Sequence, residues 1–193
     1  MELVRAAKRS VTIYTGPEGE ERADRTFNYN FAGTVVRSTT VFLYAGNTLK
    51  EALTYRGEVK DRAGETFAVL RSRTVYVGIE GEERPDRTFD YYRSGLAIRN
   101  TTVFTYSGLT LLKSITYRGN VPDKTAEATA RRRSVIFFVG LEGEERQDYS
   151  QTFYFNGVDI RATTLFYYAN KRAADATPDD PLSRTEQYRK GVL

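Results

Sequence analysis

A 62-residue period is the feature that most constrains what this chain can fold into. The sequence Gly-Glu-Glu-Arg begins at Gly19, Gly81 and Gly143, and several other residue types recur with the same step. A period of this length is typical of proteins built from stacked copies of one small unit. We therefore divide the chain into three tandem repeats, 6–67, 68–129 and 130–193. Further sets that share the step are Thr39, Thr101 and Thr163, and Gly33, Gly95 and Gly157.

Each copy has the alternating pattern of β-strands separated by turns. In the first copy, Phe27, Tyr29 and Phe31 alternate with polar residues, and the segment 39–44 is rich in Thr, Val and aromatic residues. Alternation with a period of two predicts strands. A fourth strand is expected at 53–57 and 115–119. In the third copy it comes late, at 187–191, after an insertion near 173–183. The segment 47–53 fits either a strand or one helical turn.

About four strands per copy predict an all-β protein of roughly twelve antiparallel strands. A unit this small needs its neighbours to share a core, so we expect one domain, 1–193, closed with pseudo-threefold symmetry. A β-prism, a trefoil-like barrel and a three-sheet ring all satisfy this expectation. The invariant aromatic face, with Phe42, Phe104 and Phe166, is assigned to the core. The aligned glycines Gly33, Gly95 and Gly157 predict positive φ at two-residue hairpin tips.

Composition argues against an enzyme. The chain has no histidine and no cysteine, so the commonest general base and the strongest nucleophile are both missing. We expect no cofactor and no disulfide. No segment reaches the roughly 20 apolar residues of a membrane span, and the N-terminus does not resemble a signal peptide. We therefore expect synthesis in the cytoplasm, without membrane partners, and release in a virion or another particle.

A recurring acidic loop is the one candidate metal site in the sequence. Calcium prefers several carboxylate oxygens, which this loop supplies in each copy. A solvated loop, in which the arginine of each copy pairs with neighbouring acids, explains the same residues, and we favour it. The weak calcium candidates are Glu18, Glu20, Asp24, Glu80, Glu82, Asp86, Glu142, Glu144 and Asp148.

Short basic clusters precede the first strand of each copy, as in Arg71-Ser-Arg73 and 131–133. Together with 14 tyrosines they suggest stacking on single-stranded nucleic acid. However, 29 basic residues face 25 acidic ones, and the net charge is only +4. The tyrosines also alternate as core residues do. We therefore do not expect nucleic acid as a partner.

Two functions then fit the sequence. The first is a structural component of a larger protein assembly, such as a phage virion or an injection device, with other subunits as partners. The alternative is a lectin-like module that binds carbohydrate at three equivalent sites. For the first function, arginine and tyrosine are the residue types that protein interfaces favour. The interface candidates are Arg37, Arg99, Arg161, Tyr167, Pro178, Pro181 and Tyr188.

Overall fold

The computed structural model describes residues 6–191 and has an all-β fold of antiparallel strands. The chain divides into two compact units, Met1–Ile98 and Arg99–Leu193. The division falls at the start of a strand, between Ile98 and Arg99. No helix in the described part of the chain has the length and apolar character needed to cross a bilayer.

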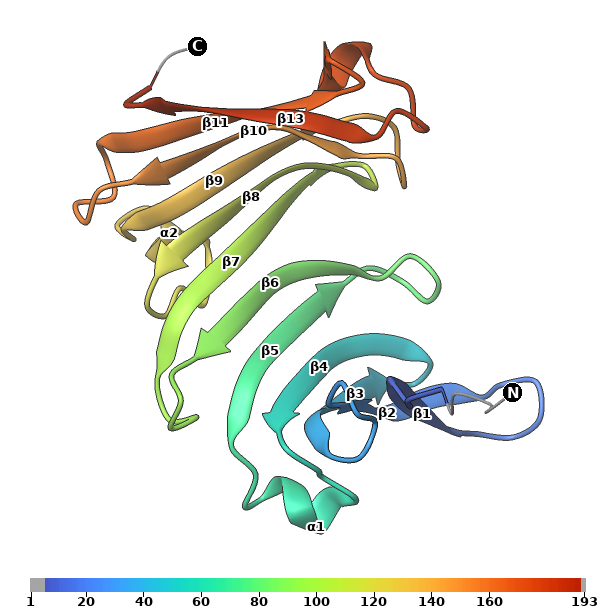
Figure 1. The fold of residues 1–193 in the computed structure, drawn as a ribbon. Coiled ribbons are helices and arrows are strands. Elements are labelled where there is room, and N and C mark those ends of the chain that lie inside the picture. Colours follow the sequence, from blue (N-terminus) through green and yellow to red (C-terminus); the bar gives the residue numbers. More distant parts are fainter. Residues whose placement is uncertain (1–5, 192–193) are drawn as a thin grey trace. The chain divides into compact units, whose positions relative to one another are not determined.

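Unit 1 is an antiparallel sheet whose strands follow one another in chain order (Figure 1). Strand pairs are joined by short loops, except that a connector with one helical turn links the fourth strand to the fifth. The elements are β1 (Ser10–Thr15), β2 (Arg22–Tyr29), β3 (Val36–Ala45), β4 (Thr48–Arg56), α1 (Arg62–Glu65), β5 (Leu70–Val77) and β6 (Arg84–Tyr91).

Unit 2 has the same kind of sheet, and its last strands both pair with β11. Its elements are β7 (Ile98–Ser107), β8 (Thr110–Arg118), α2 (Lys124–Glu127), β9 (Arg132–Val139), β10 (Arg146–Phe153), β11 (Ile160–Tyr168), β12 (Lys171–Arg172), the 3₁₀ turn η1 (Ala173–Asp175) and β13 (Leu182–Arg189). The segment 47–53 therefore belongs to a turn and to β4. The strand expected late, at 187–191, overlaps the end of β13.

The predicted closure into a prism, barrel or ring is wrong, because the described sheet is open. Within residues 6–191, β1 pairs with β2 alone and β13 pairs with β11 alone. A closed sheet leaves no edge strand. The alternating pattern predicts that each strand pairs with its neighbours in the chain, but closure also requires the two end strands to pair, and in the described residues β1 and β13 each keep one open edge. Whether the copies are related by threefold symmetry stays a prediction.

The assignment of the core face is also wrong. Phe42, Phe104 and Phe166 are half-buried. The fully buried residues lie on the opposite face of the same strands: Val41, Val103 and Leu165 are 0%, 6% and 8% exposed. In unit 1, Val41 packs with Tyr55 and with Val59, which belongs to the connector that carries α1. The core forms on this face because the connector covers it.

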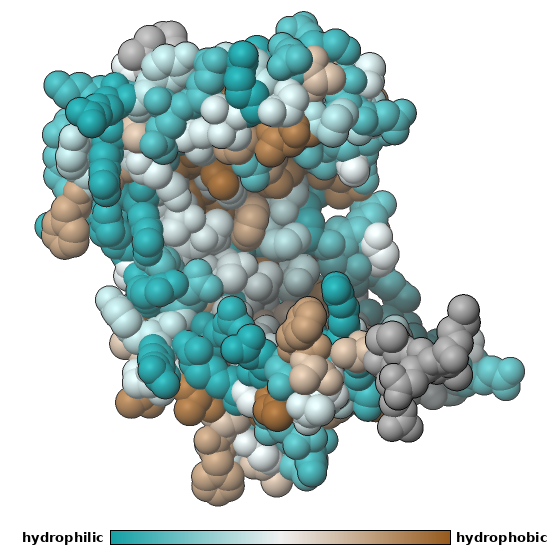
Figure 2. All heavy atoms as spheres, viewed as in Figure 1, coloured by the Kyte–Doolittle hydropathy of each residue, from teal (hydrophilic) through white to brown (hydrophobic). Residues whose placement is uncertain are grey.

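Apolar side chains also lie on the surface, as the brown residues among teal ones in Figure 2 show. Phe31 is 98% exposed, Leu96 89% and Phe67 88%. All three lie in loops, not in the strands. Single exposed apolar residues are common on protein surfaces, and only contiguous patches by themselves indicate a partner.

The hairpin glycines have the predicted positive φ, which is 70° at Gly33 and 75° at both Gly95 and Gly157. The predicted two-residue tips are wrong. In the first hairpin, Asn30 N–H donates to the carbonyl of Val35, so four residues form the tip. Glycine is needed for space as well, since a Cβ on Gly33 would lie 2.5 Å from the backbone nitrogen of Lys8.

Candidate functional site

Arginine side chains from three strands of unit 2 gather at one end of the sheet. Arg118 is the last residue of β8 and lies opposite Asn100. Arg133 in β9 and Arg161 in β11 both occupy β-bulges, where the strand register shifts. A bulge inserts an extra residue and redirects its side chain. The bulges thus explain why side chains from separate strands meet.

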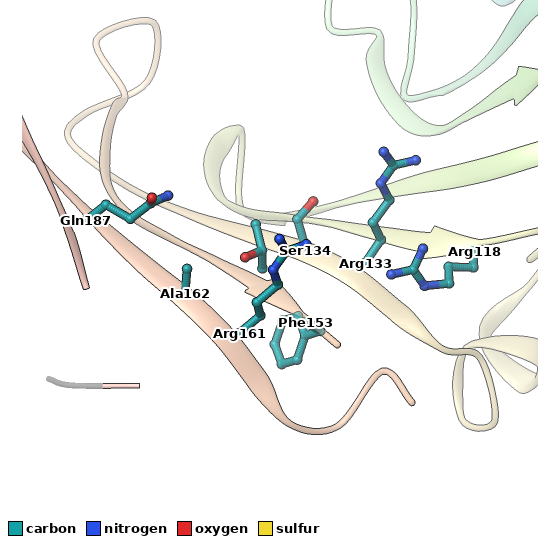
Figure 3. A pocket seen from close by; sticks show the side chains of 8 residues that line it. Arg118, Arg133, Ser134, Phe153, Arg161, Ala162 and Gln187 are labelled. Carbon is teal, nitrogen blue, oxygen red and sulfur yellow. The ribbon is translucent and has the colours of Figure 1, made fainter. Parts of the chain in front are cut away.

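These arginines line a groove of about 500 Å³, which we call the arginine groove. Its floor consists of small or polar residues, because Thr152 of β10 lies between Ser134 and Ala162 in the strand register. Figure 3 shows Arg161 extending across this floor toward Ser134, with Arg133 and Arg118 beside it. The full lining is Arg118, Arg133, Ser134, Thr152, Phe153, Arg161, Ala162 and Gln187.

The positive charge of the groove is not neutralised by the part of the chain that the structure describes. The ion pairs within residues 6–191 do not include Arg118, Arg133 or Arg161. Arg133 donates to the side-chain oxygen of Asn100 at 3.1 Å, which is a neutral acceptor. The Nε of Arg118 is buried and has no hydrogen-bond partner. A buried donor without a partner is costly, so this arginine is not fully satisfied within its own unit.

Aromatic rings next to the groove hold several arginines in place. The guanidinium of Arg132 lies 4.5 Å from the ring centre of Phe153. The guanidiniums of Arg118 and Arg131 lie 5.2 and 5.3 Å from that of Phe155, which is in the loop after β10. Such cation–π contacts favour one orientation of a long side chain. They keep the arginines ordered without neutralising their charge.

Unit 1 also has a set of three arginines, on β3, β4 and β5. Arg37, Arg56 and Arg71 line a second groove of about 450 Å³. Arg56 and Arg71 precede Arg118 and Arg133 by 62 residues. Arg37 and Arg71 also lie at register shifts, as Arg161 and Arg133 do in unit 2. The local cause of the groove is therefore the same in both units.

The interface candidates of the sequence divide into two groups. Arg37 and Arg161 line the two grooves, and Arg99 is exposed near the start of β7. Tyr167 is engaged within its own unit, since Arg184 lies 4.3 Å from its ring centre and its hydroxyl donates to Glu186 at 3.0 Å. Only the arginines have charge left to offer a partner.

Three further candidates lie at the end of unit 2. Tyr188 is 40% exposed, and its hydroxyl donates to Glu186 at 2.7 Å. Hydrogen bonds from the hydroxyls of Tyr188 and Tyr167 lower the pKa of Glu186. The backbone carbonyl of Pro178 accepts from Arg146, and that of Pro181 accepts from Ala169 N–H at 2.9 Å. The insertion is thus bonded to the sheet and is not a loose loop.

Among the described residues, no three potential metal ligands of the His, Cys, Asp or Glu type come together, in the acidic loops or elsewhere. Each loop instead ends in an aspartate that pairs with arginine. Asp24 pairs with Arg25 at 2.6 Å and Asp86 with Arg87 at 2.7 Å. Asp148 pairs with Arg172 at 2.7 Å. The glutamates at 18, 20, 80, 82, 142 and 144 are exposed.

Sequence reasoning did not bring the groove residues together. The sequence places Arg71 and Arg133 in basic clusters and makes Arg161 an interface candidate, whereas Arg118 belongs only to the strand predicted at 115–119. The signal that could have joined them is their common period, since arginine recurs at 56 and 118 and at 71 and 133. No protein-family model matches the chain, and no curated protein is significantly similar to it in sequence.

Proposed function

We propose that this protein is a non-enzymatic structural component of a larger protein assembly and binds acidic segments of partner subunits in its arginine grooves. We further propose that three 62-residue repeats form this component, and that the assembly is of the virion or injection-device kind. The observation that carries the proposal is the arginine groove, where Arg118, Arg133 and Arg161 converge without an ion pair.

The chemistry of guanidinium supports an acidic protein segment as the ligand. Guanidinium groups bind carboxylates through two parallel hydrogen bonds and lose less hydration energy than ammonium groups do. The groove is polar, and its lining has no histidine or carboxylate that could activate the hydroxyls of Ser134 and Thr152 as nucleophiles. The absence of histidine and cysteine from the whole chain agrees with a binding role.

Binding of an anionic carbohydrate is the second candidate, and the groove floor favours it. Ser134, Thr152 and Gln187 offer hydroxyl and amide groups next to the arginines, and Phe153 adds an apolar surface. Sugars with carboxylate or sulfate groups need this combination of hydrogen bonds, charge and an apolar contact. Two grooves with similar arginines would then act together through avidity.

Titration calorimetry with two probes separates these candidates. The probes are a peptide of consecutive glutamates and a sulfated oligosaccharide, each added to the wild type and to an Arg133→Gln/Arg161→Gln variant. We expect the peptide to bind the wild type, and the variant to lose at least about tenfold in affinity at the arginine groove of unit 2, since each charge-assisted hydrogen bond contributes about 1.5–3 kcal/mol. The groove of unit 1 keeps its three arginines in this variant, so the loss is measured against the remaining binding there. Binding should weaken as salt is added.

A matched control removes the same charge elsewhere. Arg62→Gln/Lys124→Gln changes two exposed residues of α1 and α2 and should leave affinity unchanged. If only the oligosaccharide binds and the groove variant abolishes it, the carbohydrate function replaces the assembly function. If neither probe distinguishes the groove variant from the control, the groove is not a binding site and the proposal fails.

A further inference from the structure

The two strands at the ends of the described sheet each have one open edge. Tyr29 N–H donates to the carbonyl of Arg9, so the backbone groups of Arg9 face β2. Backbone groups alternate in direction along a strand, and those of Ser10 therefore face away from β2. Likewise Lys190 N–H donates to the carbonyl of Arg161, so the N–H of the preceding residue, Arg189, faces away from β11.

Each unit contains an interior strand pairing whose register β13 and β1 could also adopt. β4 pairs with β5, and β8 with β9, in the same register 62 residues apart: Thr54 lies opposite Ser72, and Thr116 opposite Ser134. At the end of each pairing, Arg56 N–H donates to the carbonyl of Val69 at 2.9 Å. Arg118 N–H makes the matching bond to Arg131.

β13 matches β4 in its register with the preceding strand. Tyr188 lies opposite Thr163 as Tyr55 lies opposite Thr39. The register shift recurs as well, since Leu182 pairs with Tyr168 as Leu49 pairs with Tyr44. Arg189 thus has the place that Arg56 has in β4.

β1 matches β5 in the same way. Ser10 precedes Ser72 by 62 residues, and both strands shift register at the corresponding point, between Ile13 and Tyr14 and between Val75 and Tyr76. The edge strand β13 therefore resembles β4 in its register, and the edge strand β1 resembles β5, the strand with which β4 pairs.

We propose that β13 of one molecule pairs with β1 of a second copy of this chain, head to tail, in the register of β4 with β5. The inference rests on the proposed assembly function and names one partner within it. Transferring the register places Tyr188 opposite Lys8, Gln187 opposite Ser10, and Thr185 opposite Thr12 of the second copy. Because each copy keeps one free edge of each kind, the association is open-ended.

A glutamate next to each interior pairing supports this partner independently. Glu83 accepts the N–H of Leu49 across the β4–β5 pairing at 2.9 Å, and Glu145 accepts the N–H of Leu111 across β8–β9 at 2.9 Å. Both hydrogen bonds lower the pKa of the glutamate that accepts them. These glutamates thus act as acceptors for the start of the preceding strand.

The residues that correspond to the acceptor and the donor of that hydrogen bond lie at the two open edges. Glu21 corresponds to Glu83 and already accepts Gly19 N–H at 3.1 Å, as Glu83 accepts Gly81 N–H at 2.9 Å. Within residues 6–191, Glu21 has no N–H from a preceding strand. Leu182, at the start of β13, corresponds to Leu49. Its N–H would donate to Glu21 of the copy whose β1 pairs with this β13.

An exposed aromatic residue points to the same surface. Phe155 is in the loop after β10 and contacts Arg118, the last residue of β8. Its counterpart after β2 is Phe31, which is 98% exposed. The counterpart of Arg118 is Arg189 at the end of β13. Pairing of β13 with β1 would bring Arg189 of one copy to Phe31 of the other.

Native mass spectrometry and sedimentation velocity over a range of concentrations test the association. We expect the wild type to form a ladder of oligomers as its concentration rises. Ser10→Pro should abolish the ladder, because proline removes an N–H that the edge offers to a partner, and an edge strand tolerates it. Ser10→Ala keeps that N–H and should behave as the wild type does. A wild type that stays monomeric at every soluble concentration overturns the proposal.

Cross-linking tests the register, because the chain has no cysteine of its own. A Thr12→Cys variant mixed with a Thr185→Cys variant should give a disulfide-linked dimer, since facing residues of paired strands are about 5.5 Å apart at Cα, within disulfide range. Val11→Cys mixed with Thr185→Cys should not, because Val11 projects from the other face. Oligomers that survive Ser10→Pro, or equal cross-linking of both pairs, show a different interface or partner strand and overturn the proposal.

The two proposals fail separately. The Ser10→Pro variant keeps both arginine grooves, so its binding of the glutamate peptide reports on the proposed function without self-association. If this variant binds the peptide but the wild type forms no oligomers, only the head-to-tail inference falls. If oligomers form and the peptide does not bind, only the groove function falls.

Discussion

The hydroxyl of Thr39 fixes the start of the connector that follows β4. Its side chain is completely buried, and Oγ1 donates to the carbonyl of Gly57 at 2.9 Å while accepting Val59 N–H at 3.0 Å. Thr101 makes the matching bonds to Gly119 and Val121 at 2.8 and 3.1 Å. Each hydroxyl satisfies two backbone groups where the chain leaves a strand and turns over the sheet.

Thr39→Val keeps the shape of the side chain but removes the hydroxyl. We expect a loss of about 1–3 kcal/mol in the free energy of unfolding, because buried backbone groups lose their partner. Thr40→Val is the control, since Thr40 is only half-buried and bonds another side chain, Thr54, at 3.1 Å. Urea unfolding of both variants checks the prediction. Equal losses at the two positions would contradict it.

At the scale of elements, the sequence was informative about strands and less so about what covers them. The alternation at 39–44 correctly predicted a strand, and the delayed fourth strand is found as β13. The core face could not be predicted, because Val41 and Phe42 alternate equally well. What decides between them is the connector carrying Val59, whose path depends on contacts distant in sequence.

The candidate site was predictable only in part, for a similar reason. Arg37 and Arg161 were among the interface candidates, and each lines one of the two grooves. Their meeting with Arg71 or Arg133 depends on β-bulges, and the alternating pattern of a strand does not reveal where an extra residue is inserted. The two-residue hairpin tip failed likewise, since a single glycine with positive φ fits several loop lengths.

Two loop glutamates predict a pH dependence of stability. Hydrogen bonds from Leu49 and Leu111 lower the pKa values of Glu83 and Glu145 in the folded state. A lowered folded-state pKa stabilises the fold above the unfolded value, and this stabilisation is lost as the pH falls through the folded value. We therefore expect stability to decrease as the pH falls below 4.5, the unperturbed pKa of these groups.

The Glu83→Gln/Glu145→Gln variant should show a smaller decrease over that range, because an amide oxygen still accepts the N–H but does not titrate. The control is Glu82→Gln/Glu144→Gln, which changes the exposed neighbours in the same loops. Thermal unfolding measured from neutral pH downward compares the two. The same slope in both variants would show that these hydrogen bonds do not contribute to the pH dependence.

At the scale of the whole molecule, strands within each unit pair mainly with their neighbours in the chain. A fold of this kind has local contacts, and its stability is a sum of unit and neighbour contributions that need not be lost together. The outermost strands have a neighbour on one side only. They should therefore be the least protected parts of the sheet.

Hydrogen exchange on dilute, monomeric protein measures this difference. We expect the amides of Ser10 and Thr12 to exchange far faster than those of β3 and β4, whose N–H groups are bonded on both sides. Raising the protein concentration should slow exchange at Ser10 and Thr12 in the wild type and leave the inner strands unchanged. Uniform protection across β1 and β4 in the monomer would contradict the local character of the fold.

The connector between β4 and β5 has a consequence for how such a gene could change in length. In the proposed division into 62-residue repeats, it joins the last strand of one repeat to the first strand of the next, and the connector between β8 and β9 joins strands that pair in the same register. Unequal recombination that duplicates or deletes 62 codons would create only junctions of a kind the chain already contains. The number of 62-residue repeats could thus change during evolution without requiring a new kind of contact between strands.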